Sequence, residues 1–262
     1  MESTSFYMTL PSSTRNSDEM YPDNSASSFR IQLPKTIHLK NKYEVALVEI
    51  IYPHTWATFH HESDYKLSFI YNDPHAPTEP ALSADIKIAR GYYRSPEELC
   101  REINQSFKNK FEGKPFASLL RFSFNNITHK VRLKIDMDGK GVLKLSPGLT
   151  DVLGFKPGVF MDSIIAPYKA DINRGFYNLY IYCNICEAQI VGDAYVPLLR
   201  TVFITGKHGD MVQQIFQEPH YVPVNINSFD TIEIHIKNDM NETISFESGK
   251  VICKLHFRQK AL

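Results

Sequence analysis

The sequence lacks the features that mark several common functional classes. Its 262 residues include 29 basic and 29 acidic side chains, so the formal net charge is zero and no basic run of the kind that binds nucleic acid is present. No stretch approaches the roughly 20 consecutive apolar residues of a membrane span, and the opening residues have neither the basic start nor the apolar core of a secretory signal. We therefore expect a soluble protein of a reducing compartment, with no membrane span and no direct sequence-specific nucleic acid binding.

Cysteine is scarce, and its spacing argues against disulfides and metals. Four residues, Cys100, Cys183, Cys186 and Cys253, are too few for a disulfide framework in a chain of this length. Cys183 and Cys186 have the spacing of a redox or metal-binding pair, but they lie in a predicted strand, where residues three apart point to opposite faces. We therefore expect small core thiols and no metal site.

Catalytic motifs are also missing from the sequence. It contains no phosphate-binding loop, nucleophile elbow or zinc-protease helix. An enzyme would need distant residues such as His220, Asp230 and Cys253 to converge. Aromatic residues are abundant instead, with 17 Phe and 14 Tyr, and they suit contact surfaces as well as cores. We expect no catalytic residues and no cofactor, in a protein that works through its surfaces.

Two segments near the C-terminus have the alternation of strands with one buried face. The predicted inward residues are Ile232, Ile234 and Ile236 in the first segment and Val251, Cys253, Leu255 and Phe257 in the second. Loops containing Pro, Asn and Gly separate further candidate strands at 29–33, 43–52, 65–71, 85–89, 177–187, 198–204 and 211–216. This pattern predicts a mainly β protein built as a sandwich or barrel.

The middle of the chain departs from this pattern. Ser95 as N-cap, Pro96 at the first helical position and Glu98 in a capping box predict a helix that runs to about Lys108. Short alternating runs follow at 120–124, 131–135 and 142–145, and a helical turn at 149–153 ends at Gly154. We interpret this part as an inserted small α+β subdomain.

The predicted organisation has three parts. Residues 1–84 hold an N-terminal arm and the first sandwich strands, 85–165 form the inserted subdomain, and 166–262 hold the remaining strands. Within the first part, 11–28 is rich in Ser, Asn and Asp and poor in apolar residues, which predicts a loop or a mobile arm. Asp136, Asp138 and Gly139 faintly resemble a calcium loop, but the flanking helices and the final Glu are missing, and a hairpin turn explains them better.

Longer blocks spread over nearly the whole chain carry a resemblance to a known family. They are FYMTLPSS (6–13), YPDN (21–24), FRIQLP (29–34), EVALVEIIYPHTW (44–56), GYYRSPEEL (91–99), LGF (153–155), LYIYC (179–183), QIVGD (189–193), PLLR (197–200), PHYVP (219–223), FDTI (229–232) and FESGK (246–250). Together they resemble the minor capsid (penton) proteins of Polinton, or Maverick, elements and their adintovirus relatives.

The resemblance implies a specific fold and role. The fold would be a single jelly-roll with decorations. The chain would assemble as a homopentamer at the fivefold vertices of an icosahedral virion capsid, beside a double-jelly-roll major capsid protein, after synthesis in the host cytoplasm. An alternative that the residues leave open is a monomeric β-sandwich module that binds a glycan or a receptor.

The same resemblance suggests proteolytic processing. The residues Met137 to Gly141 resemble the recognition pattern of adenovirus-like maturation proteases, which would place a processing turn at Gly139, Lys140 and Gly141. The local alternative is a turn in which Gly supplies a positive φ angle. Exposed turns are also where proteases cut, so the two interpretations are compatible.

Overall fold

The structure is a computed structural model that describes residues 5–59, 61–72 and 81–260. It divides into two compact units. The first unit is made of Met1–Trp56 and Phe176–Leu262, and the second, the inserted unit, is Ala57–Gly175.

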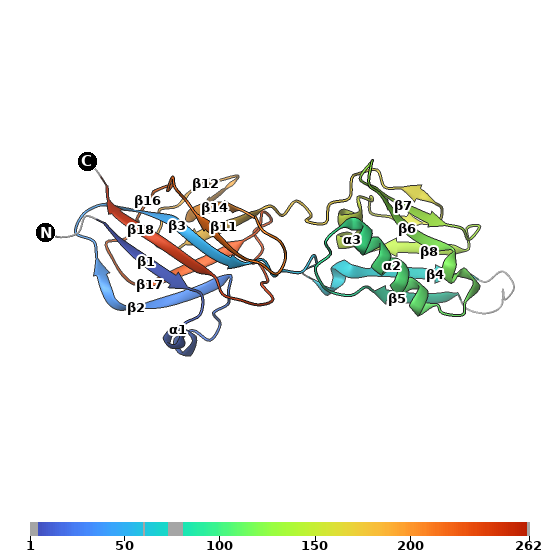
Figure 1. The fold of residues 1–262 in the computed structure, drawn as a ribbon, viewed down its shortest axis with the longest axis horizontal. Helices are drawn as coiled ribbons and strands as arrows, with labels where there is room; N and C mark the ends of the chain where they lie inside the picture. The colour runs from blue at the N-terminus through green and yellow to red at the C-terminus, as the bar shows by residue number, and fades with distance from the viewer. Residues whose placement is uncertain (1–4, 60, 73–80, 261–262) are drawn as a thin grey trace. The chain divides into compact units, whose positions relative to one another are not determined.

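The first unit is a sandwich of two antiparallel sheets (Figure 1). Its strands are β1 (Ser5–Pro11), β2 (Ser28–His38), β3 (Tyr43–Pro53), β11 (Asn178–Cys183), β14 (Leu198–Phe203), β15 (Met211–Ile215), β16 (Val222–Pro223), β17 (Ser228–Lys237) and β18 (Ile252–Gln259). One sheet has the order β1-β18-β3-β15, with β16 also paired to β3, and the other has the order β14-β11-β17-β2. Apart from the short strand β16, which stays in the sheet of β15, the chain crosses to the other sheet at every connection except that from β11 to β14. This is the connectivity of an eight-stranded jelly roll, so the predicted fold class is confirmed and we call this part the jelly-roll unit.

The core of the jelly-roll unit lies between the two sheets. The alternation predicted for its last two strands is confirmed, because all seven inward residues are fully buried. The two strands belong to opposite sheets, so their apolar faces meet across the core, where the rings of Phe229 and Phe257 lie 5.9 Å apart. Each fully buried aliphatic or aromatic side chain of this kind contributes about 1.5–3 kcal/mol to the free energy of unfolding.

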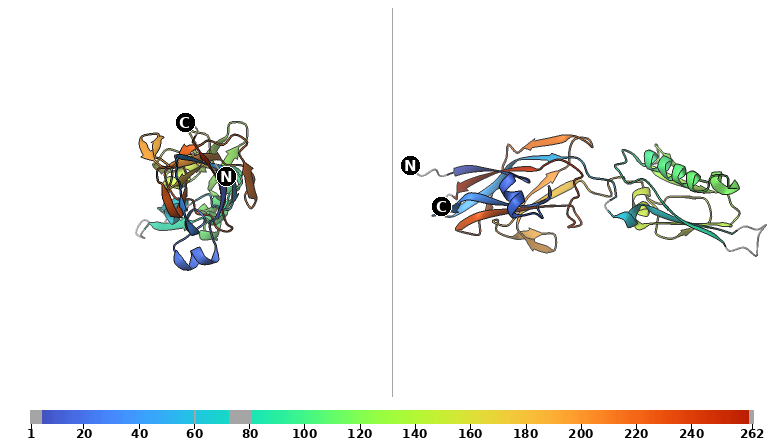
Figure 2. Two further views of the ribbon diagram at one scale, coloured as in Figure 1. Left: turned by 90° about the vertical axis from the view of Figure 1, so that its left-hand side faces the viewer. Right: turned by 90° about the horizontal axis from the view of Figure 1, so that it is seen from below.

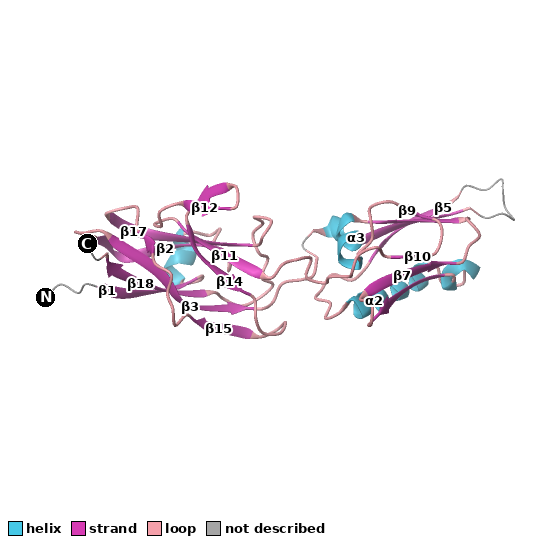
Figure 3. Cartoon of the chain, turned by 90° about the horizontal axis from the view of Figure 1, so that it is seen from above, coloured by secondary structure: helices cyan, strands magenta, loops and turns pink. Residues whose placement is uncertain are grey.

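The inserted unit contains two smaller sheets (Figure 3). It has a hydrophobic core of its own. The sheet of order β5-β4-β8-β9 contains β4 (Lys66–Tyr71), β5 (Leu82–Lys87), β8 (Gly141–Leu145) and β9 (Val159–Phe160). The sheet of order β10-β7-β6 contains β6 (Leu120–Asn125), β7 (Lys130–Ile135) and β10 (Ile164–Ile165). Its helices are α2 (Pro96–Lys110), α3 (Pro147–Leu153) and the short 3-10 turns η1 (Glu62–Tyr65) and η2 (Pro115–Ser118).

The inserted unit is longer than the segment 85–165 that the sequence suggests. The segment 65–71, an expected sandwich strand, forms β4, which pairs with β5 and β8 and contributes the buried Leu67 and Phe69 to the core of the inserted unit. At the other end, the unit extends to Gly175. Alternation shows that a strand has a buried face, but it does not show against which sheet that face packs.

Helix α2 begins where the capping signals place it. Ser95 Oγ accepts a hydrogen bond from the Glu98 backbone N–H, and Pro96 occupies the first turn. The Glu98 carboxylate accepts from the backbone N–H of Arg94, one residue before the N-cap, at 2.8 Å. The helix ends at Lys110, and its apolar stripe is buried: Leu99, Cys100, Ile103 and Phe107. The predicted helix is thus confirmed, with a variant of the expected capping box.

The segment predicted as a loop or mobile arm is ordered. It contains a short helix, α1 (Arg15–Met20), whose N-cap Thr14 accepts a hydrogen bond from the Ser17 backbone N–H at 3.3 Å. Ser17 is buried, and Asn24 Nδ2 donates to the carbonyl of Arg30. Polar composition is misleading here, because these side chains form local hydrogen bonds with the backbone that hold the segment in place.

A two-stranded hairpin interrupts the connection from β11 to β14. It consists of β12 (Gln189–Val191) and β13 (Ala194–Val196), joined by a two-residue turn in which Gly192 has a φ of +62°. Turns that suit two-residue hairpins need a positive φ angle at the first central residue, which Gly adopts without strain.

No helix in the described part of the chain is both long and apolar enough to cross a bilayer.

Candidate functional site

The turn at 137–140 is present, but it is not a hairpin. The Lys140 backbone N–H donates to the Met137 carbonyl at 2.9 Å, and Asp138 and Gly139 have φ angles of +46° and +74°. The strands on either side, β7 and β8, lie in different sheets and do not pair. The predicted hairpin is therefore wrong, since the turn carries the chain from one sheet to the other.

The three residues of the predicted processing site differ in exposure. Gly139 is exposed at the tip of the turn, Lys140 is half-buried, and Gly141 is buried at the start of β8. A Cβ added at Gly141 would collide with the sulfur of Met137, which is itself buried. Cleavage of this turn remains a prediction. A protease that binds the residues from Met137 to Gly141 in an extended conformation would need the turn to open first.

The cysteine pair behaves differently from the prediction. Strand β11 ends at Cys183, and a turn follows in which the Cys186 backbone N–H donates to the Cys183 carbonyl at 3.1 Å. Both thiols therefore enter the same core, and their mutual hydrogen bond, together with burial, raises the pKa of Cys186. The expectation that the two sulfurs point apart is wrong, because the strand stops before the second cysteine. All four cysteines are buried and free, as predicted.

The structure does not bring the hypothetical catalytic residues together. Cys253 is fully buried in the core, where burial raises the pKa of its thiol. His220 and Asp230 are both exposed on the surface, and Asp230 accepts a hydrogen bond from Thr231 at 3.1 Å. Within the described ranges, no group of three or more His, Cys, Asp or Glu side chains is arranged to hold a metal ion.

The outer face of the sheet that contains β1 and β18 carries a row of stacked aromatic and basic side chains. The ring of Tyr7 on β1 stacks on His256 of β18, its partner in the register, with centroids 4.3 Å apart. Tyr221 Oη and His256 Nδ1 are hydrogen-bonded at 2.7 Å. The guanidinium of Arg258 lies 3.4 Å from the centroid of the Tyr221 ring. Burial and the positive charge of Arg258 lower the pKa of His256, so the neutral imidazole is favoured.

The charges around this aromatic row are paired. Glu44 accepts two hydrogen bonds from Arg258 at 3.1 Å, and Glu49 lies 3.3 Å from the ammonium of Lys254. A hydrogen bond from Gln213 is the main reason that the pKa of Glu49 is lowered. Tyr and Arg held in fixed positions are typical of protein–protein contact surfaces.

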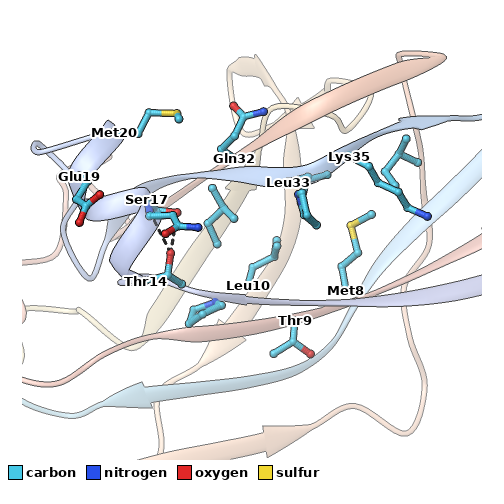
Figure 4. A pocket seen from close by; sticks show the side chains of 15 residues that line it. Met8, Thr9, Leu10, Thr14, Ser17, Glu19, Met20, Gln32, Leu33 and Lys35 are labelled. Atoms are coloured by element: carbon cyan, nitrogen blue, oxygen red, sulfur yellow. Dashed lines mark hydrogen bonds between the residues drawn. The ribbon is translucent and has the colours of Figure 1, made fainter.

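A groove of about 940 Å³ lies between β1 and β2, beside α1 (Figure 4). Strand β2 leaves its partner β17 between Gln32 and Ile37, and this irregularity opens the groove. The apolar residues that line it are Met8, Leu10, Pro11, Met20, Ile31, Leu33, Pro34 and Ile37. The groove is thus an apolar cleft at one edge of the sandwich.

Both strands that border the groove are edge strands. Among the described residues, β1 pairs only with β18 and β2 pairs only with β17. An open edge next to an apolar cleft is where another polypeptide adds most readily. The sequence gives no signal for this site, because the register irregularity that creates it depends on the pairing of distant strands.

Comparisons with known proteins identify the fold. No family model and no curated protein sequence matches the chain. Among solved structures, the mavirus penton protein matches over 98% of this chain and 99% of its own length, with a TM-score of 0.52 and 13% sequence identity. A chain of the Sputnik virophage structure matches over 99% of both chains with a TM-score of 0.47 and 13% identity.

The fold therefore defines a structural class, a jelly roll with a large unit inserted between the third and fourth strands of the roll. Within this class the chain has the fold of a penton protein, that of mavirus, over nearly the whole length of both chains. The resemblance to penton proteins that the sequence indicates is confirmed at the level of the fold.

Proposed function

We propose that this chain is a structural virion protein, the minor capsid (penton) protein that forms a homopentamer at the fivefold vertices of an icosahedral capsid. The observation that carries the proposal is the match to the mavirus penton protein over 98% and 99% of the two chains, which includes the jelly roll as well as the inserted unit. A shared jelly roll alone would be weak support, because this fold serves many functions.

The physical properties of the jelly-roll unit suit such a ring. Five identical copies related by rotation meet through heterologous contacts, in which one patch binds a different patch on the next copy. A formal net charge of zero keeps identical copies from repelling one another. The open edge at β1 and β2 and the aromatic row of Tyr7, His256 and Tyr221 offer different patches for contact.

The wider assignment follows from the sequence resemblance. It includes an origin in a Polinton element or an adintovirus-like virus, contact with a double-jelly-roll major capsid protein, synthesis in the host cytoplasm and processing at Gly139, Lys140 and Gly141. Co-expression with a major capsid protein of this type tests the contact, since the two chains should then co-sediment as larger assemblies than either forms alone.

A second function has one specific observation in its favour. The exposed ring of Tyr7, stacked on His256 and next to Arg258, offers an aromatic face with hydrogen-bonding groups around it. Such a face would also suit a glycan- or receptor-binding module that acts as a monomer. Glycan binding by a protein that stays monomeric would favour this alternative over the penton.

Light scattering on the purified protein, followed by negative-stain imaging, distinguishes the two functions. The penton proposal predicts a species of five chains that appears as five-lobed rings. A strictly monomeric species at high protein concentration and raised salt would contradict a ring that forms from this chain alone.

A further inference from the structure

We propose that the β12–β13 hairpin of one copy docks into the groove between β1 and β2 of the next copy. This inference rests on the proposed pentamer and identifies the two surfaces that meet in it. The occupant of the groove is therefore a second copy of this chain.

The hairpin and the groove lie at opposite edges of the jelly-roll unit. The groove is bordered by β1 and β2, the strands at one end of each sheet order, and the hairpin leads into β14, at the other end of its sheet. In Figures 1 and 2 the helix α1, which borders the groove, and the hairpin project from opposite sides of the sandwich. Two complementary surfaces on opposite sides are what a closed ring of identical subunits requires.

The hairpin carries an apolar pair that the jelly-roll unit leaves in solvent. Ile190 and Tyr195 are directly opposite each other in the register of the two strands, and their side chains are 80% and 70% exposed. An isolated two-stranded hairpin is only marginally stable in water, so it gains from burial against a partner. Large exposed apolar side chains in a cluster mark contact sites.

The apolar surface continues from the hairpin along the same edge of the sandwich. Phe203 on β14 and Met211 and Ile215 on β15 are all exposed. Strands β14 and β15 are the end strands of their sheets, opposite β2 and β1. One edge of the sandwich therefore presents apolar side chains outward, while the other presents an apolar cleft.

The groove matches the hairpin in size and charge. Its volume of about 940 Å³ and its apolar lining are suited to two large side chains such as Ile190 and Tyr195. The groove carries two charged side chains, the exposed Lys35 of β2 and Glu19 of α1, and Glu19 is paired with Arg15 at 3.6 Å. Asp193 is exposed at the tip of the hairpin. Attraction between Asp193 and Lys35 would direct the tip of the hairpin to the β2 side of the groove.

The first test removes the apolar pair. The double variant Ile190→Ser/Tyr195→Ser should shift the monomer–pentamer midpoint at least tenfold to higher protein concentration, as measured by analytical ultracentrifugation. Because both side chains are exposed in the single chain, its circular dichroism spectrum and melting temperature should match those of the wild type at concentrations where both proteins are monomeric. The matched control is Ile127→Ser, a 90% exposed isoleucine in the turn between β6 and β7 of the inserted unit, which should leave the midpoint unchanged.

The second test joins the two surfaces covalently. A chain with Tyr195→Cys is mixed with a chain with Lys35→Cys and treated with a short thiol-to-thiol cross-linker; the native cysteines are all buried. We expect covalent dimers in the mixture, none with either chain alone, and a ladder up to five chains when both changes are in one chain. The pair Ile127→Cys with Lys35→Cys is the control and should give no ladder.

The outcomes separate the two proposals. If the wild type forms pentamers, unchanged assembly of the double variant together with absent cross-links would overturn the docking of the hairpin and leave the penton intact. Cross-links in the Tyr195→Cys chain alone would also overturn it, because the contact would then join like surfaces. A wild-type protein that stays monomeric would overturn both.

Discussion

The two units of this protein differ at particular sheet edges, β6 in the inserted unit and β1 and β2 in the jelly-roll unit. In the inserted unit the side chain of Asn104, on α2, bonds the exposed edge of β6: its amide accepts from the Phe122 N–H at 2.7 Å and donates to the Phe122 carbonyl at 2.8 Å. In the jelly-roll unit the edges at β1 and β2, beside an apolar groove, have no further strand paired to them among the described residues. An edge that is capped prevents pairing with another chain, and an edge that is open invites it. This difference agrees with the proposal that the jelly-roll unit makes the contacts between copies.

The largest expected effect comes from breaking one core without the other. Each unit has its own buried cluster, so we expect the two units to unfold in separable transitions. Phe257→Ala should lower the free energy of unfolding of the jelly-roll unit by about 3–5 kcal/mol, and Phe107→Ala should do the same in the inserted unit. Chemical denaturation, with hydrogen exchange used to measure the stability of each unit separately, checks this. If either change lowers the free energy of unfolding of both units equally, the two cores are not independent.

A smaller effect should come from the capped edge itself. Asn104→Ala leaves the N–H and carbonyl of Phe122 without their partner and should cost about 1–3 kcal/mol in the inserted unit only. Gln105→Ala, on the exposed side of the same helix, is the matched control and should change the stability by less than about 0.5 kcal/mol. If Asn104→Ala and Gln105→Ala lower the free energy of unfolding equally, the hydrogen bonds between Asn104 and Phe122 contribute nothing to stability.

The smallest effect concerns the pH dependence of the aromatic row. The folded-state pKa of His256 is lowered, so the unfolded chain binds this proton more readily, and the stability falls as the pH drops through the ordinary value of about 6.5 toward the folded-state value. Protonation would also oppose the guanidinium of Arg258. Melting temperatures between pH 5 and pH 8 should therefore fall less steeply with acid in His256→Gln than in the wild type.

His54 provides a check on this pH experiment. Its pKa is also lowered, mainly by burial, so it contributes to the same acid destabilisation and remains in the His256→Gln protein. A His54→Gln variant should remove a separate part of the fall in melting temperature between pH 8 and pH 5. Identical pH profiles for the wild type and His256→Gln would show that the row around Tyr221 does not perturb the imidazole.

The parts of the fold that the sequence predicts are those with local signals. The cap at Ser95 and the alternation around Ile234 and Leu255 depend on residues within a few positions of each other, and the structure has them as expected. The sequence pattern does not locate the start of the inserted unit, because β4 alternates in the same way whichever sheet it joins. The position of a strand in a sheet is decided by long-range pairing, which a local pattern does not contain.

The candidate site was harder to predict than the fold. The groove depends on the loss of pairing between β2 and β17, and the stacking of Tyr7 on His256 joins the two ends of the chain. One local signal was available: Gly192-Asp193 between Ile190 and Tyr195 has the chemistry of a two-residue hairpin turn. That signal identifies the hairpin, but not the edge of the sandwich on which it stands.

The central claim is that the jelly-roll unit closes a ring of identical copies through its two unlike edges. Native mass spectrometry of the purified wild-type protein beside Ile190→Ser/Tyr195→Ser tests it most directly. The account predicts a discrete assembly of five 30.1 kDa chains for the wild type and mainly monomer for the double variant at the same concentration. The same five-chain assembly in both proteins, or a wild type that is monomeric throughout, would contradict it.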